Sequence, residues 1–228
     1  MQQMKIGIEA NLYRYLFKNV YFINGTAYAG KSTMVRMLAE AYDGIECGEN
    51  YHLALRDAAV PEYQPNMSYF QTMSGWQEFV TRTPEDYAAW IAGGAKEAAE
   101  MELLILTQTV LDNPDKKIFV DTNISLELLR EISDESHVAL MLAPGWMSVS
   151  RFFDRPDAEK QFIYQKLLEC PDPEAALANY RKILEKCNSP EIYRAFEESG
   201  FFVYKRTEES TLDEAFSAVA GHFGLIES

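Results

Sequence analysis

The most chemically informative stretch of the sequence is an octapeptide that begins at Gly25. Four residues separate Gly25 from Gly30, Lys31 and Ser32, which satisfies the phosphate-loop pattern G-x-x-x-x-G-K-[ST]. Glycines let the backbone wrap closely around a phosphate, so that successive N–H groups form an anion nest. In such a loop the lysine reaches the β- and γ-phosphates and the serine hydroxyl ligates Mg²⁺. These residue types at this spacing predict a site for the phosphates of a nucleotide.

The segments on either side of the loop have the patterns that a true phosphate loop requires. Residues 20–23 are an apolar run suited to a buried strand, and residues 34–41 carry apolar side chains at helical spacing. The positive N-terminal end of that helix adds to the attraction for phosphate. A glycine-rich turn can match the pattern by chance, but this context favours nucleotide binding. The candidate contacts are Gly25, Thr26, Ala27, Tyr28, Ala29, Gly30, Lys31, Ser32 and Thr33.

An aspartate ends a second apolar run, at residues 117–121. In phosphate-loop proteins an aspartate at the carboxyl end of a strand holds Mg²⁺. Asp121 would do so directly or through water, or would orient the acceptor hydroxyl. The alternative is that it caps the helix expected from about Ser125. Ser32 and Asp121 are the candidate metal ligands.

Polar residues after a short strand that ends at Gly48 form a candidate acceptor-binding cluster. Glu46 and Glu49 would lie near the carboxyl end of the sheet, where open α/β folds bind ligands. His52 and Arg56 are four residues apart and would share one face of a helix. The alternative is an ordinary solvated helix face.

Arginines follow the fourth and fifth predicted strands. Arg151 and Arg155 are four residues apart, so a helix would place both on one face, where they could neutralise a phosphoryl group in transfer. The alternative is a surface ion pair with Asp154. Arg206 comes directly after the last strand, where a nucleobase often lies, and is a further candidate contact to the nucleotide.

The composition excludes several classes of protein. The 228 residues include 21 basic and 35 acidic side chains, and the net charge of −14 disfavours nucleic-acid binding, which needs clustered lysine and arginine. Cys47, Cys170 and Cys187 form no close pair, so we expect neither a disulfide framework nor a zinc site. No apolar run is long enough for a membrane span, and residues 1–5 lack the apolar core of a signal peptide. We therefore expect a cytoplasmic protein without membrane contact.

Apolar runs and helical patterns alternate along the chain. Five runs separated by helical patterns imply parallel strands joined by right-handed crossovers. We predict a single α/β domain over residues 1–228, with a helical acceptor-binding insertion at about 50–112. Within it, residues 83–86 (Thr-Pro-Glu-Asp) are typical of a helix start. Residues 5–18 read as a short packing helix or as an arm that contacts a second chain, so a homodimer is possible.

This order of elements resembles that of P-loop kinases of the nucleoside-monophosphate kinase and shikimate kinase type. The resemblance covers nearly the whole chain in element order, and at residue level it rests on Gly25–Thr33, Asp121 and Arg151/Arg155-Pro156. It implies a doubly wound five-stranded parallel sheet of order 2-3-1-4-5 with helices on both faces. It also implies ATP phosphates on the loop, Mg²⁺ at Ser32 and Asp121, and a helical lid over residues 146–170 whose arginines close over the γ-phosphate.

The chain departs from the signatures of individual kinase families. Asp121 is followed by Thr-Asn and not by the D-G-F-P-R context of adenylate kinases, and the Glu-Arg-Ser signature of deoxynucleoside kinases is absent. Glu46 and Glu49 replace the paired aspartates of the shikimate type. We predict ATP- and Mg²⁺-dependent phosphoryl transfer to a small molecule, with Lys31, Asp121, Arg151 and Arg155 as catalytic residues. The alternative is a nucleotide-dependent switch or binding protein without such an acceptor, and a weaker one is a kinase of a macromolecule or nucleotide sugar.

Overall fold

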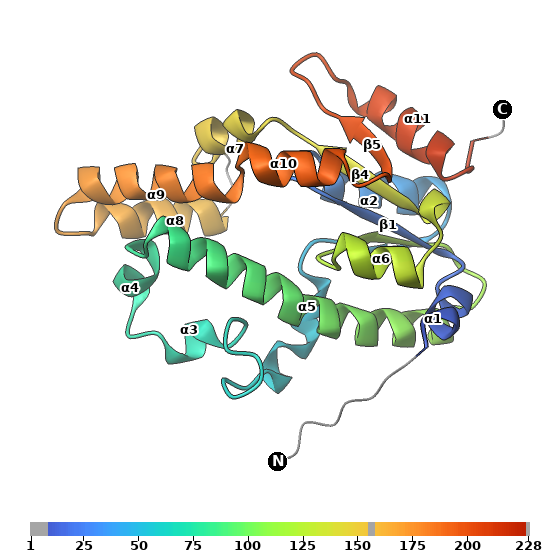
Figure 1. Ribbon diagram of the computed structural model, residues 1–228, viewed down its shortest axis with the longest axis horizontal. Helices are drawn as coiled ribbons and strands as arrows, with labels where there is room; N and C mark the ends of the chain where they lie inside the picture. The colour runs from blue at the N-terminus through green and yellow to red at the C-terminus, as the bar shows by residue number, and fades with distance from the viewer. Residues whose placement is uncertain (1–8, 155–157, 227–228) are drawn as a thin grey trace.

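A parallel sheet forms the centre of the computed structural model, which describes residues 9–154 and 158–226 (Figure 1). The strands are β1 (Val20–Gly25), β2 (Ile45–Cys47), β3 (Ile118–Asp121), β4 (Val138–Leu142) and β5 (Phe202–Lys205). All five pair in parallel, in the order β2-β3-β1-β4-β5. The predicted fold class and strand order are confirmed. Directly before β4, the chain forms a short 3₁₀ helix, η2 (Glu135–His137).

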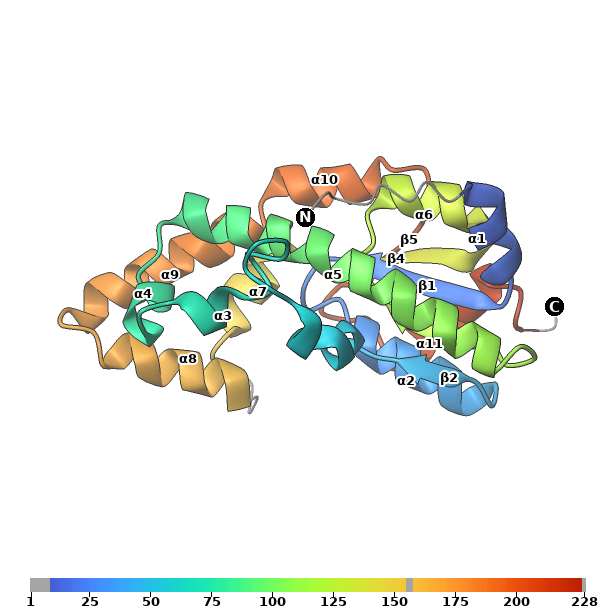
Figure 2. The ribbon, with the colours of Figure 1, turned by 90° about the horizontal axis from the view of Figure 1, so that it is seen from below.

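Helices cover both faces of the sheet, as Figure 2 shows from below. On one face, α2 (Lys31–Ala41) and α11 (Leu212–His222) bury apolar side chains such as Met34, Leu38 and Val219 against the strands. On the other face lie α1 (Ala10–Leu16), α6 (Leu126–Ile132), α10 (Pro190–Glu197) and the C-terminal half of α5 (Pro84–Asp112). Since both faces are covered, β1 and β4 are buried along almost their whole length.

A helical layer extends beyond the carboxyl end of the sheet (Figure 1). It contains α4 (Trp76–Val80), α7 (Gly145–Arg151), α8 (Ala158–Leu168), α9 (Pro173–Cys187) and the N-terminal half of α5. Phe79, Leu167, Tyr180 and Ile183 form its separate apolar core. The shorter helices η1 (Tyr51–Ala58) and α3 (Tyr69–Thr72) lead into this layer. The predicted insertion and lid thus pack together here.

The long helix α5 links the two cores. It starts as predicted, with Pro84 at its first position and the Thr83 hydroxyl accepting a hydrogen bond from the Asp86 amide at 3.1 Å. It runs without a break through Gly93, where a Cβ would lie 2.3 Å from the Asn66 side chain. Gly93 therefore serves close packing rather than ending the helix.

The N-terminal helix α1 packs on α6. Arg14 donates a hydrogen bond from Nε to the carbonyl oxygen of Glu131, at 2.7 Å. Phe17, which follows the helix, is buried, whereas Leu12 and Tyr15 are exposed. The described part of the segment at residues 5–18 therefore forms a packing helix, and Tyr13 and Leu16 are the side chains that it packs against the core. Within the described residues, no helix is long and apolar enough to cross a bilayer.

Candidate functional site

The loop after β1 has the backbone shape of an anion nest. Gly25 and Gly30 have φ angles of 132° and 92°, and Tyr28 between them has a φ of 66°. A Cβ at position 25 would lie 2.0 Å from the carbonyl oxygen of Met141, so only glycine fits beside β4. These positive φ angles are most accessible to glycine, which explains two fixed positions of the motif.

Contacts from neighbouring strands hold this loop in place. The Thr26 hydroxyl donates to the carbonyl oxygen of Ala143 at 3.1 Å and accepts from the Ala143 amide at 2.7 Å. From the end of β5, Arg206 donates from Nη1 to the carbonyl oxygen of Tyr28 at 2.6 Å. Arg206 therefore supports the loop itself, and its predicted contact with a nucleobase stays a prediction. These contacts fix the shape of the nest.

The candidate metal ligands lie against each other. Because Ile23 of β1 pairs with Asp121 of β3, the carboxylate ends at the same edge of the sheet as the loop. There the Ser32 hydroxyl donates to Oδ2 of Asp121 at 2.8 Å. A hydroxyl and a carboxylate are hard oxygen donors, and a Mg²⁺ site needs few protein ligands because water and phosphate complete it. The pair therefore fits Mg²⁺.

Asp121 is 5% exposed, and burial is the main reason that its pKa is raised. Negative charge on Glu49 and Glu102 raises this pKa further, whereas Lys31 and the hydrogen bond from Ser32 lower it. Lys31 donates from Nζ to the carbonyl oxygen of Thr26 at 3.1 Å, so its ammonium group is held inside the loop. A bound cation would add to the positive charge beside the carboxylate.

Glu102 of α5 fixes the segment that follows Asp121, and the sequence analysis missed it. Its carboxylate is fully buried and accepts from the Thr122 hydroxyl at 2.6 Å, the Asn123 amide at 3.0 Å and Asn123 Nδ2 at 2.8 Å. The signal was present, because Glu102 lies in the apolar stripe of α5. A carboxylate on the buried stripe of a helix must have partners to be stable there.

The four residues of the predicted acceptor cluster are not brought together. Glu49 lines the cavity described below, but Glu46 is exposed on the edge strand β2. His52 is buried, with Nδ1 3.6 Å from Oε1 of Glu102, whereas Arg56 is exposed beside Asp57. The predicted shared face is wrong because η1 is a 3₁₀ helix, in which residues three apart align and residues four apart do not.

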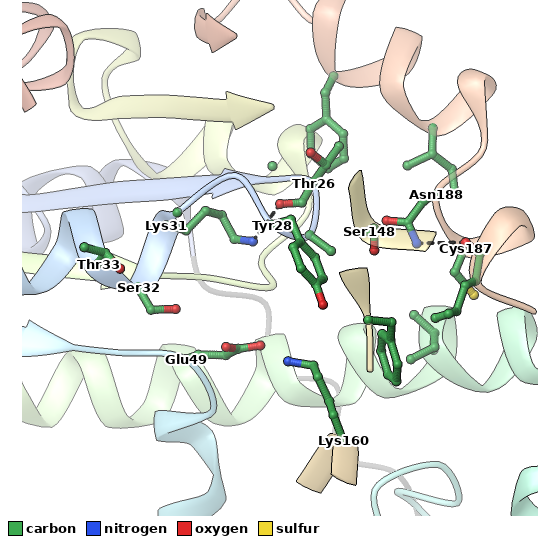
Figure 3. A pocket seen from close by; sticks show the side chains of 18 of the residues that line it. Thr26, Tyr28, Lys31, Ser32, Thr33, Glu49, Ser148, Lys160, Cys187 and Asn188 are labelled. Carbon is green, nitrogen blue, oxygen red and sulfur yellow. Dashed lines mark hydrogen bonds between the residues drawn. The ribbon is translucent and has the colours of Figure 1, made fainter. Parts of the chain in front are cut away.

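A cavity of about 510 Å³ lies between the phosphate loop and the helical layer (Figure 3). Lys31 and Ser32 lie at one end, and Cys187 and Asn188 lie at the other. Between these two ends, the Glu49 carboxylate and the Lys160 ammonium group extend into the cavity and point toward each other. The lining residues are Gly25, Thr26, Ala27, Tyr28, Gly30, Lys31, Ser32, Thr33, Glu49, Tyr87, Ile91, Ser148, Phe152, Lys160, Leu184, Cys187, Asn188, Ile192 and Phe196.

Among the described residues of the lid, the cation that lines this cavity is Lys160 of α8, whereas Arg151 does not line it. Arg151 ends α7 and lies with Nη2 3.3 Å from Oε1 of Glu208, in the loop after β5. Arg151 therefore pairs with this acidic loop and not with Asp154, and it does not line the cavity. Arg155 lies outside the described residues. The sequence analysis missed Lys160 because its helix looked like an ordinary solvated face.

Comparison of the sequence with known protein families and with curated proteins gives no match. The chemical interpretation therefore depends on the site alone: the nest of Gly25–Thr33, the Ser32–Asp121 pair and the cavity beside them.

Proposed function

We propose that this protein is a kinase that transfers the γ-phosphoryl group of ATP to a small molecule, with Mg²⁺ as cofactor. The observation that carries the proposal is the hydrogen bond between Ser32 and Asp121 at the mouth of a phosphate-loop nest. In that arrangement the loop amides and Lys31 bind the phosphates, and Ser32 and Asp121 hold the cation. Mg²⁺ supplies charge neutralisation on the β- and γ-phosphates when bound.

The remaining residues of the cavity support transfer to an acceptor rather than to water. Lys160 can approach the phosphoryl group from the helical layer and neutralise its charge. Glu49 can orient the acceptor hydroxyl and accept its proton. With an acceptor bound, the walls from α5, α7 and α9 would shield the phosphoryl group from water, which would limit wasteful hydrolysis. A cytoplasmic location belongs to the same proposal, because Cys47, Cys170 and Cys187 are all free thiols.

The test is to incubate the protein with γ-labelled ATP, Mg²⁺ and a pool of small metabolites, and to repeat this with Lys31→Ala. We expect label on one class of small molecule with the wild type and none with the variant. Full turnover by Lys31→Ala would refute the mechanism. Slow phosphate release without a labelled acceptor, together with nucleotide-dependent binding of a partner protein, would favour a switch instead.

A further inference from the structure

The wall of the cavity that faces the phosphate loop is mainly apolar, with Ser148 and Asn188 as its polar residues. Helices from different parts of the chain each direct side chains at helical spacing into it. These side chains are Tyr87 and Ile91 of α5, Phe152 after α7, Leu184 and Cys187 of α9, and Ile192 and Phe196 of α10. The polar loop and the apolar wall thus face each other across one space, so a ligand that fills it needs one polar end and one apolar body.

Two residues of this wall are left in contact with solvent. Ile91 is 45% exposed and Ile192 is 40% exposed, although both line a concave site. Contact of large aliphatic side chains with water costs free energy in proportion to their apolar area. A ligand with an apolar body would remove this contact, whereas a sugar or another polyol would not.

The charges of the described lining residues favour an acceptor without a phosphate of its own. Among its described lining residues the cations are Lys31 and Lys160, and no arginine is present. On the proposed function both lysines are engaged by the nucleotide. A nucleoside monophosphate would need further cations, typically arginines that bind phosphate with two hydrogen bonds. Glu49 would instead repel it.

We infer that the acceptor is an alcohol that carries an apolar group about as large as a six-membered ring and has no phosphate of its own. This inference rests on the proposed function and specifies its acceptor. The hydroxyl oxygen forms a bond to the γ-phosphorus as the bond from that phosphorus to the β,γ-bridging oxygen breaks. ADP leaves with the electron pair of the broken bond, and the hydroxyl proton passes to the Glu49 carboxylate and then to water. The products are a phosphate monoester and ADP.

The probe is a series of phenylalkanols, from benzyl alcohol to 4-phenyl-1-butanol, titrated by ligand-observed NMR with Mg²⁺ and a non-hydrolysable ATP analogue present. We expect about fourfold tighter binding for each added methylene that is buried. With γ-labelled ATP, label should appear on the phenylalkanols and not on AMP. Ile91→Ser should weaken phenylalkanol binding about fivefold. Leu104→Ser is the matched control, because Leu104 is on the same helix, is 66% exposed and does not line the cavity.

Several results would overturn the inference while leaving the kinase intact. One is an affinity for phenylalkanols that does not change along the series. Another is transfer of label to AMP and to no phenylalkanol. A third is that Ile91→Ser and Leu104→Ser weaken phenylalkanol binding equally. Weaker ATP binding by Ile91→Ser would also overturn it, because the apolar wall would then hold the nucleobase. Failure of the proposed function is recognised separately, as ATP binding that does not depend on Lys31.

Discussion

The hydroxyl of Ser32 donates a hydrogen bond to Oδ2 of Asp121, although the two residues are 89 positions apart in the sequence. Parallel pairing of β1 with β3 produces this contact, because Ile23 is aligned with Asp121 and the phosphate loop starts at the same edge. Separate contacts position each of the two residues. The loop fixes Ser32, and the buried carboxylate of Glu102 fixes the residues after Asp121.

We expect Ser32→Ala to weaken ATP binding at least about tenfold when Mg²⁺ is present and to change it little when Mg²⁺ is removed. The physical reason is that Ser32 contributes a metal ligand rather than a phosphate contact. Ser32→Thr is the control, since it keeps the hydroxyl that the motif requires. Calorimetric titration of ATP with Mg²⁺ and with EDTA measures the difference. Equal losses under both conditions would argue against a metal at this pair.

A second prediction concerns the two cations of the helical layer. Lys160→Ala should lower kcat about a hundredfold, because Lys160 extends into the cavity. Arg151→Ala should change kcat less than about threefold, because Arg151 is half exposed and pairs with Glu208. Steady-state ATP consumption with a phenylalkanol or a labelled pool acceptor compares the two variants. A larger loss in Arg151→Ala would show that Arg151, and not Lys160, reaches the phosphoryl group.

The fold and the backbone shape of the loop after β1 were predictable because their signals are local. Apolar runs mark β1 and β4, helical spacing marks α2, and the spacing of Gly25, Gly30 and Lys31 marks the loop. Strand order followed from resemblance to a known architecture. None of these features depends on a contact between side chains that are far apart in the sequence.

The surroundings of the loop were less predictable because they depend on tertiary contacts. Lys160 and Arg151 are both lid cations in the sequence, and only the contact with Glu208 separates their roles. His52 and Arg56 were grouped on the assumption of an α-helix, whereas the chain forms a 3₁₀ helix there. Glu102 could have been found from its place in the apolar stripe of α5, but its partners Thr122 and Asn123 lie in another segment.

A third prediction tests Glu102 as the support of the segment after β3. Glu102→Ala should lower the free energy of unfolding by about 3 kcal/mol, because it leaves the buried Thr122 hydroxyl and the partly buried Asn123 amide without their acceptor. Glu102→Gln keeps one acceptor oxygen and should cost less. The matched control is Glu100→Ala, since Glu100 is exposed on the same helix. Urea denaturation measures all three, and equal stability of Glu102→Ala and Glu100→Ala would contradict the assignment.

The last prediction uses Cys187 as a probe of the cavity that does not depend on activity. Burial raises the pKa of this thiol, against a smaller lowering by Lys186. The thiolate is the reactive form, so alkylation by iodoacetamide should be slow at neutral pH and should still accelerate above about pH 8.5, the ordinary thiol pKa. A rate that levels off below that pH would show that the pKa is not raised.

Because Cys187 lies in the apolar wall, 4-phenyl-1-butanol should slow its alkylation, whereas inorganic tripolyphosphate, which fits only the loop end, should not. Cys170 is the internal control, since it is buried away from the cavity and its rate should not respond to either compound. Cys47 should stay unmodified, because burial together with the charges of Glu102 and Glu46 raises its pKa to about 12. Mass spectrometry of the alkylated peptides separates the three sites. If tripolyphosphate protected Cys187 and 4-phenyl-1-butanol did not, the compound bound at the loop would be the one that covers Cys187. The apolar wall would then have no role in acceptor binding.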